Sequence, residues 1–215
     1  MAILFDVLPD NVEVDGIKYE IATDYRIMAN FEHQLMTSDR GNRKAVAKIF
    51  FDTLLLFYKG NIPNDTDKAI DRLWWFYRCG EDISSKSNQA GTKSNVRLYD
   101  YEIDGAMIAA AFAETYQVDI INSHLHWWIF RSYFANLNEN TRFVKIMSYR
   151  GVDPKEFKGK QRRMYIKLKE RYALPIIHHT PMTLEEREAE YKRRMVENRD
   201  RRLAEERKRM SGEKR

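Results

Sequence analysis

LHWWIFRSYFANLNENTRFVKIMSYRG, residues 125–151, is rich in aromatic residues and contains two adjacent tryptophans. When residues 123–137 are placed on a helix at about 100° per residue, apolar side chains fill more than half of its circumference. A helix that is apolar on most sides is buried on most sides. We therefore expect this segment to be the central helix of a compact, mainly α-helical domain. The side chains that fill the arc are Leu125, Trp127, Ile129, Phe130, Tyr133, Phe134 and Leu137.

Two polar residues on this predicted helix need an explanation. Arg131 follows Trp127 by one turn, a spacing that favours stacking of the guanidinium on the indole. His126 falls within the apolar arc, beside Tyr133 and Leu137. It could be a ligand or an acid–base group. Because no carboxylate or cysteine lies at ligand spacing beside it, we favour a core histidine that is hydrogen-bonded to a neighbour.

The composition limits the classes of protein to be considered. The chain has 215 residues and no run that resembles a signal peptide or a membrane span, so we expect one domain, with or without an appendage. Its one cysteine, Cys79, excludes an internal disulfide framework and favours a packed thiol in a reducing cytoplasm. The net charge of +5 is a small difference between 37 basic and 32 acidic residues, so it is a weak indication of nucleic-acid binding.

The first 80 residues predict a β-hairpin followed by three helices. In residues 12–21, VEVDGIKYEI, apolar and polar residues alternate around Asp15-Gly16, a dipeptide typical of two-residue hairpin turns. Such a hairpin must pack on helices, or pair with a strand from residues 3–7 or from another chain. The helices are expected after Thr23 or Asp24, after the break at residues 39–42, and from Asn64 or Asp65 to Gly80.

Residues 81–95, EDISSKSNQAGTKSN, lack periodicity and predict a mobile surface loop. We expect Asp100 to cap the next helix, which runs through Tyr116. Its alanines predict the close approach of a neighbouring helix. The residues expected to face inward are Ile103, Met107, Ala110, Ala111 and Phe112.

After a short helix over residues 139–150, Asp153 and Pro154 are expected to start a strongly basic helix that extends to about Tyr172. This helix could contact phosphates. We favour a solvated outer face, because the bases lie around most of the helix and no DNA-reading motif is recognisable. The predicted domain spans residues 1–174. A linker at 175–182 contains His178-His179, a pair without a third metal ligand nearby.

The last 33 residues, 183–215, hold 12 Lys or Arg and 9 Asp or Glu, and Thr183 and Glu186 form a capping box. Glu and Lys or Arg residues four apart predict one long charged helix. The whole chain contains no paired carboxylates in an acid–base setting, no P-loop and no G-x-S-x-G, H-E-x-x-H or C-x-x-C motif. We therefore assign no catalytic, cofactor-binding or metal-binding residues, and expect a binding protein rather than an enzyme.

Several stretches resemble one family. Residues 125–151 are closely similar to tailed-bacteriophage proteins of the gene product fifteen type. The same resemblance is carried by LPDNVEVDGIKYEIATDYR at 8–26, LWWFYRCG at 73–80 and YDYEIDGAMIAAAF at 99–112, and it extends over residues 8–174. The family belongs to tail-morphogenesis gene clusters of phages and prophages of Gram-positive bacteria. It resembles the tail assembly chaperones encoded beside the tape measure protein, and it implies no catalytic residues.

The resemblance implies a tail assembly chaperone that holds the tape measure protein until tail-tube subunits polymerise around it. Such a protein would act in the host cytoplasm during assembly and be absent from the mature virion. Its partners would be the tape measure protein, with the tail-tube protein and self-association as further possibilities, and no membrane. Two alternatives stay open: a structural or connector component of the virion tail, and a nucleic-acid-binding protein that uses the basic helix and the charged C-terminal segment.

Overall fold

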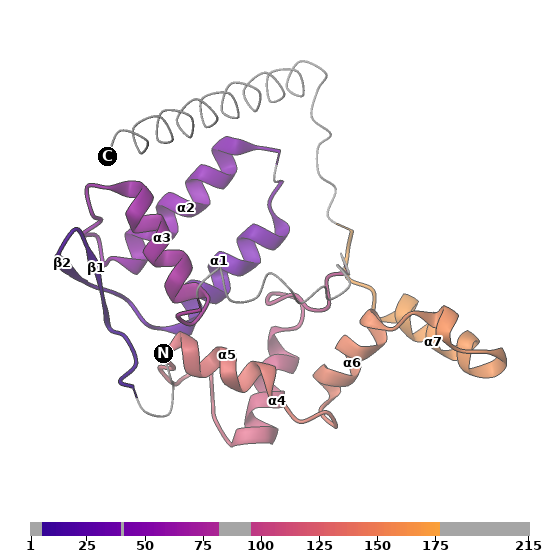
Figure 1. The fold of residues 1–215 in the computed structure, drawn as a ribbon. Helices are drawn as coiled ribbons and strands as arrows, with labels where there is room; N and C mark the ends of the chain where they lie inside the picture. Colours follow the sequence, from indigo (N-terminus) through magenta and orange to yellow (C-terminus); the bar gives the residue numbers. More distant parts are fainter. Residues whose placement is uncertain (1–5, 40, 82–95, 177–215) are drawn as a thin grey trace, which may run out of the picture. The chain divides into compact units, whose positions relative to one another are not determined.

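A computed structural model describes residues 6–39, 41–81 and 96–176 of the chain. These residues form one β-hairpin, seven α-helices and a 3-10 turn (Figure 1). The mainly α-helical fold and its N-terminal hairpin are therefore confirmed. Nearly all of the predicted loop at 81–95, most of the linker at 175–182 and the whole charged helix at 183–215 lie outside the described residues. The domain boundaries derived from the sequence stay predictions.

The hairpin consists of β1, Asn11–Val14, and β2, Ile17–Glu20, with Val14 opposite Ile17. Asp15 and Gly16 have φ of 52° and 77°, as a type I′ turn requires. Val12 and Val14 are buried, and β1 packs against α3, Thr66–Tyr77. Of the alternatives open for the hairpin, packing on a helix is the one observed.

The first three helices begin at side-chain caps. α1, Tyr25–Thr37, is capped by Asp24, and α2, Arg43–Phe57, by Asn42. α3 is capped by Asp65 and is followed by Cys79 and Gly80, both at positive φ. All three caps accept a hydrogen bond from a backbone N–H of the first turn, which is the interaction that makes Asp and Asn good helix starts. The sequence predicted these helices correctly.

α4 comprises Gly105–Tyr116 and begins later than predicted. The carboxylate of Asp100 accepts from the backbone N–H groups of Glu102 and Ile103, so it closes a tight turn before the helix instead of capping it. The buried face of the helix also differs from the prediction. Ile103 and Ala110 are exposed, against prediction, while Ile108 is buried together with the expected Ala111 and Phe112.

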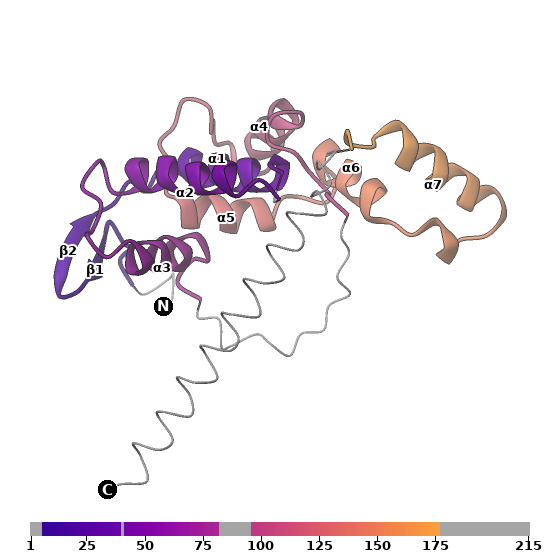
Figure 2. The ribbon, with the colours of Figure 1, turned by 90° about the horizontal axis from the view of Figure 1, so that it is seen from above.

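α5, Trp127–Ala135, is shorter than the helix predicted over residues 123–137. The residues before it are extended, because the N–H of Tyr25 donates to the carbonyl of Leu125 and the N–H of Trp127 to that of Thr23. The central position is confirmed. Figure 2 shows α5 alongside α1, against which it packs, and Trp127, Trp128 and Phe130 are at most 2% exposed.

The C-terminal part of the described chain contains α6, Arg142–Gly151, the 3-10 turn η2, Pro154–Glu156, and α7, Gly159–Arg171. The single helix predicted from Asp153 to Tyr172 is wrong at its start. Asp153 caps η2, and the chain then breaks at Gly159, whose φ of 56° suits glycine. α7 packs against α6 and η2, and none of its residues is buried. Among the described residues, no helix is long and apolar enough to cross a membrane.

Candidate binding surfaces

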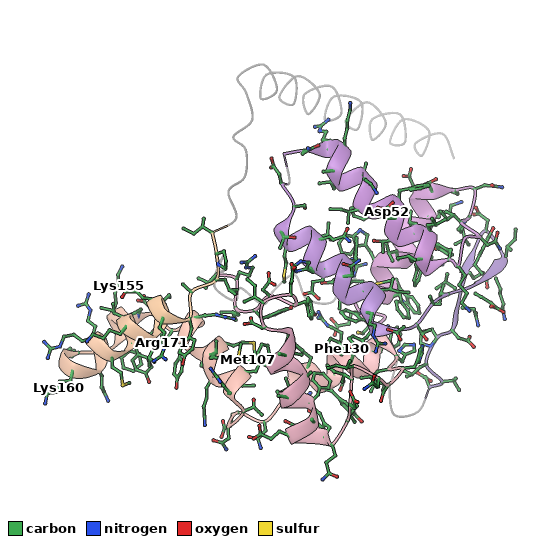
Figure 3. All side chains as sticks on the ribbon, turned by 180° about the vertical axis from the view of Figure 1, so that it is seen from behind. Asp52, Met107, Phe130, Lys155, Lys160 and Arg171 are labelled. Atoms are coloured by element: carbon green, nitrogen blue, oxygen red, sulfur yellow. The ribbon has the colours of Figure 1, made fainter. Side chains whose placement is uncertain are left out.

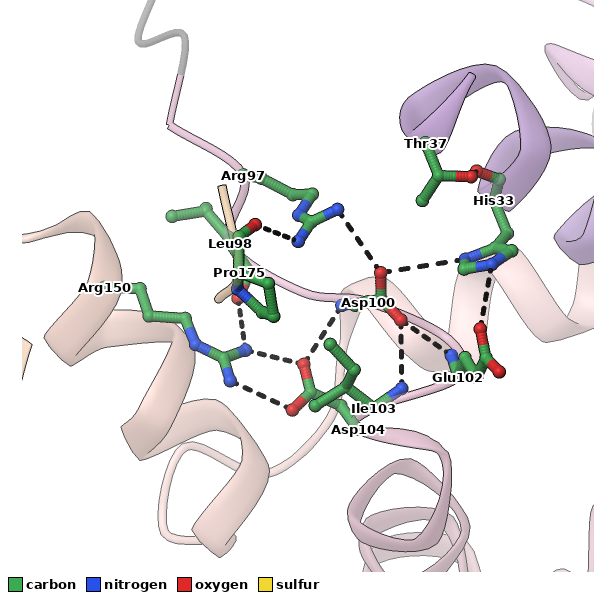
Figure 4. A network of polar contacts seen from close by, with 10 residues as sticks. All are labelled: His33, Thr37, Arg97, Leu98, Asp100, Glu102, Ile103, Asp104, Arg150 and Pro175. Atoms are coloured by element: carbon green, nitrogen blue, oxygen red, sulfur yellow. Dashed lines mark hydrogen bonds and ion pairs between the residues drawn. The ribbon is translucent and has the colours of Figure 1, made fainter. Parts of the chain in front are cut away.

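Arg150 holds three segments together at the junction of α4 and α6 (Figure 4). Its guanidinium donates to both carboxylate oxygens of Asp104, at 2.6 and 3.0 Å, and to the carbonyl of Leu98 at 2.9 Å. Its Nε donates to the carbonyl of Tyr172 at 2.7 Å. Because Arg150 is 6% exposed and the Asp104 side chain is fully buried, each ion depends on the other to satisfy its charge.

Asp100 connects this region to α1 (Figure 4). Its carboxylate lies 3.4 Å from the Arg97 guanidinium and 3.8 Å from Nδ1 of His33. The other ring nitrogen of His33 lies 3.5 Å from the exposed Glu102 carboxylate. Arg97 also donates to the carbonyl of Pro175, near the end of the described chain. Residues 97–104 are thereby tied to α1, α6 and the segment after α7.

A third buried carboxylate, Glu32 of α1, is satisfied by aromatic hydroxyls. Tyr99 and Tyr101 donate to its two oxygens at 2.7 and 3.1 Å, and Arg131 lies 3.7 Å away. Burial and the neighbouring Glu32 charge raise the pKa of the Tyr101 hydroxyl, so it stays a donor at neutral pH. The Arg131 guanidinium lies 5.5 Å from the Trp127 ring, which agrees with the predicted stacking.

The two adjacent indoles donate hydrogen bonds to the C-terminal end of α3. Trp127 Nε1 donates to the carbonyl of Tyr77 at 2.9 Å, and Trp128 Nε1 donates to that of Phe76 at 2.8 Å. These carbonyls belong to the last turn of a helix, where intrahelical partners are few, and that of Phe76 also accepts from the N–H of Cys79 at 3.0 Å. The indoles therefore supply both packing volume and two hydrogen bonds.

His126 was predicted to lie in the apolar arc of the central helix. Instead, it caps the N-terminus of α5. Its Nδ1 accepts from the N–H of Trp128, and its Nε2 lies 3.1 Å from the carbonyl of Pro9. Together these contacts require the neutral ring with the proton on Nε2. Burial lowers the pKa of His126. The interpretation as a histidine hydrogen-bonded to neighbours is correct, although the sequence misplaced it.

An open groove of about 720 Å³ runs along α1 and α4. Ile121, which is 66% exposed, and the partly exposed Tyr25 and Tyr101 contribute apolar surface, while Ala29, Gly105, Ala106 and Ala109 leave space beside them. Figure 3 labels Phe130 and Met107 of this region. The alanines of α4 predicted a closely packed neighbouring helix, but Ala106 is exposed and, with Ala109, lines the groove. The small side chains thus create a place for a helix that no described segment of this chain fills.

The ends of the groove are polar. At one end, Arg26 pairs with Asp24 and donates to the carbonyls of Ile120, Ile121 and Ser123, which fixes the loop before α5. At the other end lie His33 and Glu102, which are held by the Asp100 contacts described above. An apolar trough with fixed polar ends is typical of a surface that accepts an amphipathic helix.

α2 exposes a second apolar area. Phe51, Leu55 and Leu56 are 59%, 45% and 52% exposed, on the side of the helix that also carries the Lys48–Asp52 ion pair. Figure 3 labels Asp52 on this side of α2. Several large exposed apolar residues on one helix are unusual for a surface that remains in water, and they are typical of interaction sites. The sequence analysis did not single out this face, although Leu54–Leu56 is an unbroken apolar run.

The Cys79 thiol is not activated by its surroundings. Burial raises the pKa of the Cys79 thiol to about 11, so the thiol stays protonated at neutral pH and is a poor nucleophile. Within residues 6–39, 41–81 and 96–176, no group of three His, Cys, Asp or Glu residues could hold a metal ion.

Comparison with protein families finds one match, and it covers most of the chain. The family described as Bacteriophage Gp15 protein matches residues 4–174. The chain belongs to this family. No curated protein and no solved structure matches the chain significantly.

The Gp15 family match includes every surface described above. The groove, the exposed face of α2, and α7 all lie within residues 4–174, whereas the charged residues 183–215 lie beyond the match. The chain is therefore a bacteriophage protein whose candidate binding surfaces are part of the family domain.

Proposed function

We propose that this Gp15 family protein is a tail assembly chaperone that holds the tape measure protein in solution until tail-tube subunits surround it. The supporting observation is the groove along α1 and α4, which has the small side chains and the apolar surface that an amphipathic helix needs. A long, partly apolar helical chain aggregates unless its apolar faces are covered. Holding such a chain requires no nucleotide and no catalytic group.

The lining of the groove explains how one helix could be held without a deep pocket. Ala29 on one wall and Gly105, Ala106 and Ala109 on the other allow a helix backbone to approach closely. The apolar surface of Ile121, Tyr25 and Tyr101 then contacts the apolar face of the bound helix. Since apolar contacts are little affected by ionic strength, the complex should survive high salt.

The first test is co-expression with the tape measure protein of the same gene cluster, scoring its solubility and co-purification. Ala106→Trp fills the groove, so we expect it to abolish solubilisation while leaving the thermal melt of the protein unchanged. Ala113→Trp is the matched control, because Ala113 is exposed on the same helix and does not line the groove. Solubilisation by Ala106→Trp as efficient as by the wild type would overturn the assignment of the groove.

The proposal also places the protein in the host cytoplasm during assembly and outside the mature virion. Mass spectrometry of purified virions tests this placement. Stoichiometric amounts of the protein in virions would favour a structural or connector component of the tail instead. The tail-tube protein is a second expected partner, since the tube must displace the chaperone as it polymerises, and its co-purification can be scored in the same experiment.

A further inference from the structure

α7 carries a basic face that the groove hypothesis does not use. At about 100° per residue, Lys160, Arg163, Lys167 and Arg171 fall within about 80° of one another around the helix. They follow one another at intervals of three or four residues over about 16 Å of helix. All four are exposed, and Figure 3 shows Lys160 pointing away from the domain at the free end of α7.

The position of this basic face is fixed by the opposite side of the helix. Tyr165 packs on Phe157 with ring centroids 4.4 Å apart, and Tyr172 stacks on Tyr149. Lys169 Nζ donates to the carbonyl of Val152, on the same inner side. Tyr165, Tyr172 and Lys169 therefore mark the inner side of α7, and the row of four bases lies on the opposite side, a distinction that the sequence did not reveal. Of the remaining bases of the helix, the exposed Arg162 falls near Lys169 around the helix.

The four bases differ from several other basic residues of this domain, which pair with acids. No ion pair joins any of them to a carboxylate among the described residues. In contrast, Arg26, Lys48, Lys59, Lys68, Arg131 and Arg150 each pair with a described acid. Four unpaired like charges on one helix repel one another, so a partner that supplies carboxylates at matching intervals gains energy from every contact.

An apolar side chain lies within the same row. Met164 is 48% exposed and falls about 20° from Arg171 around the helix. Glu170 lies at the opposite edge, beside Arg163. The phosphate backbone of a nucleic acid offers no apolar surface for a methionine side chain, and a carboxylate repels it. An amphipathic helix has an apolar stripe for the methionine and can present a neutral or basic residue to Glu170.

We infer that the outward face of α7 docks an acidic amphipathic helix of a protein partner, as a site separate from the groove. Glutamates or aspartates spaced three or four residues apart along that helix would meet Lys160, Arg163, Lys167 and Arg171. A leucine or similar residue between them would cover Met164. The basic row then positions and orients the partner, while Met164 discriminates a helix from a simple polyanion.

The test uses the full-length protein and a fluorescent helical peptide with glutamates at i, i+4 and i+7 and one leucine stripe. We expect binding that weakens as salt increases. Lys160→Glu/Lys167→Glu should lower the affinity by about tenfold or more. Lys44→Glu/Lys145→Glu is the control, since it changes the net charge equally at exposed bases outside α7, and its affinity should stay within about twofold of the wild type.

Two further probes separate an acidic helix from other occupants. Met164→Ser should weaken binding of the peptide, and a peptide of the same composition with scrambled order should bind poorly. Equal binding of the scrambled peptide would mean that the face attracts any acidic chain by charge alone, and would overturn the inference. Binding of a DNA duplex that is lost in Lys160→Glu/Lys167→Glu but unaffected by Met164→Ser, with no binding of the peptide, would overturn the inference in favour of a phosphate-contacting face.

Discussion

Replacing Arg150 by Ala should destabilise the domain more than any exposed substitution on the same helix. The change removes four hydrogen bonds to Leu98, Asp104 and Tyr172 and leaves the fully buried Asp104 carboxylate without its counter-ion. Breaking a buried ion pair from one side costs about 3–5 kcal/mol. Because many domains have a total stability of about 5–15 kcal/mol, the variant should be close to unfolding at 37 °C.

Urea unfolding followed by tryptophan fluorescence measures this loss, since the chain contains four tryptophans. Arg150→Lys keeps the charge but cannot reach all four acceptors, so we expect an intermediate loss. Arg142→Ala is the matched control on α6, where an exposed arginine should contribute within about 0.5 kcal/mol. If Arg150→Ala unfolds within about 1 kcal/mol of the wild type, the junction of α4, α6 and residue 172 is not held as described.

Three further outcomes are expected. Trp127→Ala should lower the free energy of unfolding by about 3–5 kcal/mol, because it leaves a cavity beside Phe130 and an unsatisfied carbonyl on Tyr77. Thermal or urea unfolding measures this loss, and an unfolding curve identical to that of the wild type would contradict the central position of α5. Gly80→Ala should lower the melting temperature more than Gly60→Ala. Both glycines have positive φ, but only at Gly80 would the added Cβ meet the Trp128 ring, at 3.0 Å, so equal losses would mean that the contact contributes nothing. His126, whose pKa is lowered by burial, stabilises the fold in its neutral form. The free energy of unfolding should therefore decrease as pH falls below about 6.5, and His126→Asn should flatten this dependence; an unchanged pH profile of the variant would exclude the capping role.

The elements with strong local signals could be predicted from the sequence. Asp15-Gly16 located the hairpin turn, and Asp24, Asn42 and Asp65 located three helix starts, because each of these residues acts on backbone within three or four positions of itself. The helix starts predicted at Asp100 and Asp153 were wrong for the same reason. Both make hydrogen bonds to nearby N–H groups, but in a turn and in a 3-10 turn, which have the same local signature as a helix start.

The candidate binding surfaces depend on long-range packing and were only partly predictable. The alanines of α4 predicted the close approach of a neighbouring helix, but Ala106 and Ala109 line an open groove, which only the arrangement of α1 and α4 reveals. The outward row on α7 could not be separated from the other bases until Tyr165 and Tyr172 identified the inner side. The role of Arg150 could not be predicted from the sequence, because its hydrogen-bond acceptors lie far from it along the chain, at residues 98, 104 and 172.

The hydrogen bonds from Trp127 and Trp128 to the end of α3 also constrain how the protein is made. The donor on Trp128 lies 52 residues after its acceptor on Phe76, so a nascent chain that ends before α5 leaves the face at the C-terminal end of α3 uncovered, although α2 and β1 already pack on this helix. Synthesis at about 5–20 residues per second would keep that face exposed for several seconds. The N-terminal half should therefore depend on host folding factors, or on rapid synthesis of α5, before the whole domain closes around the two indoles.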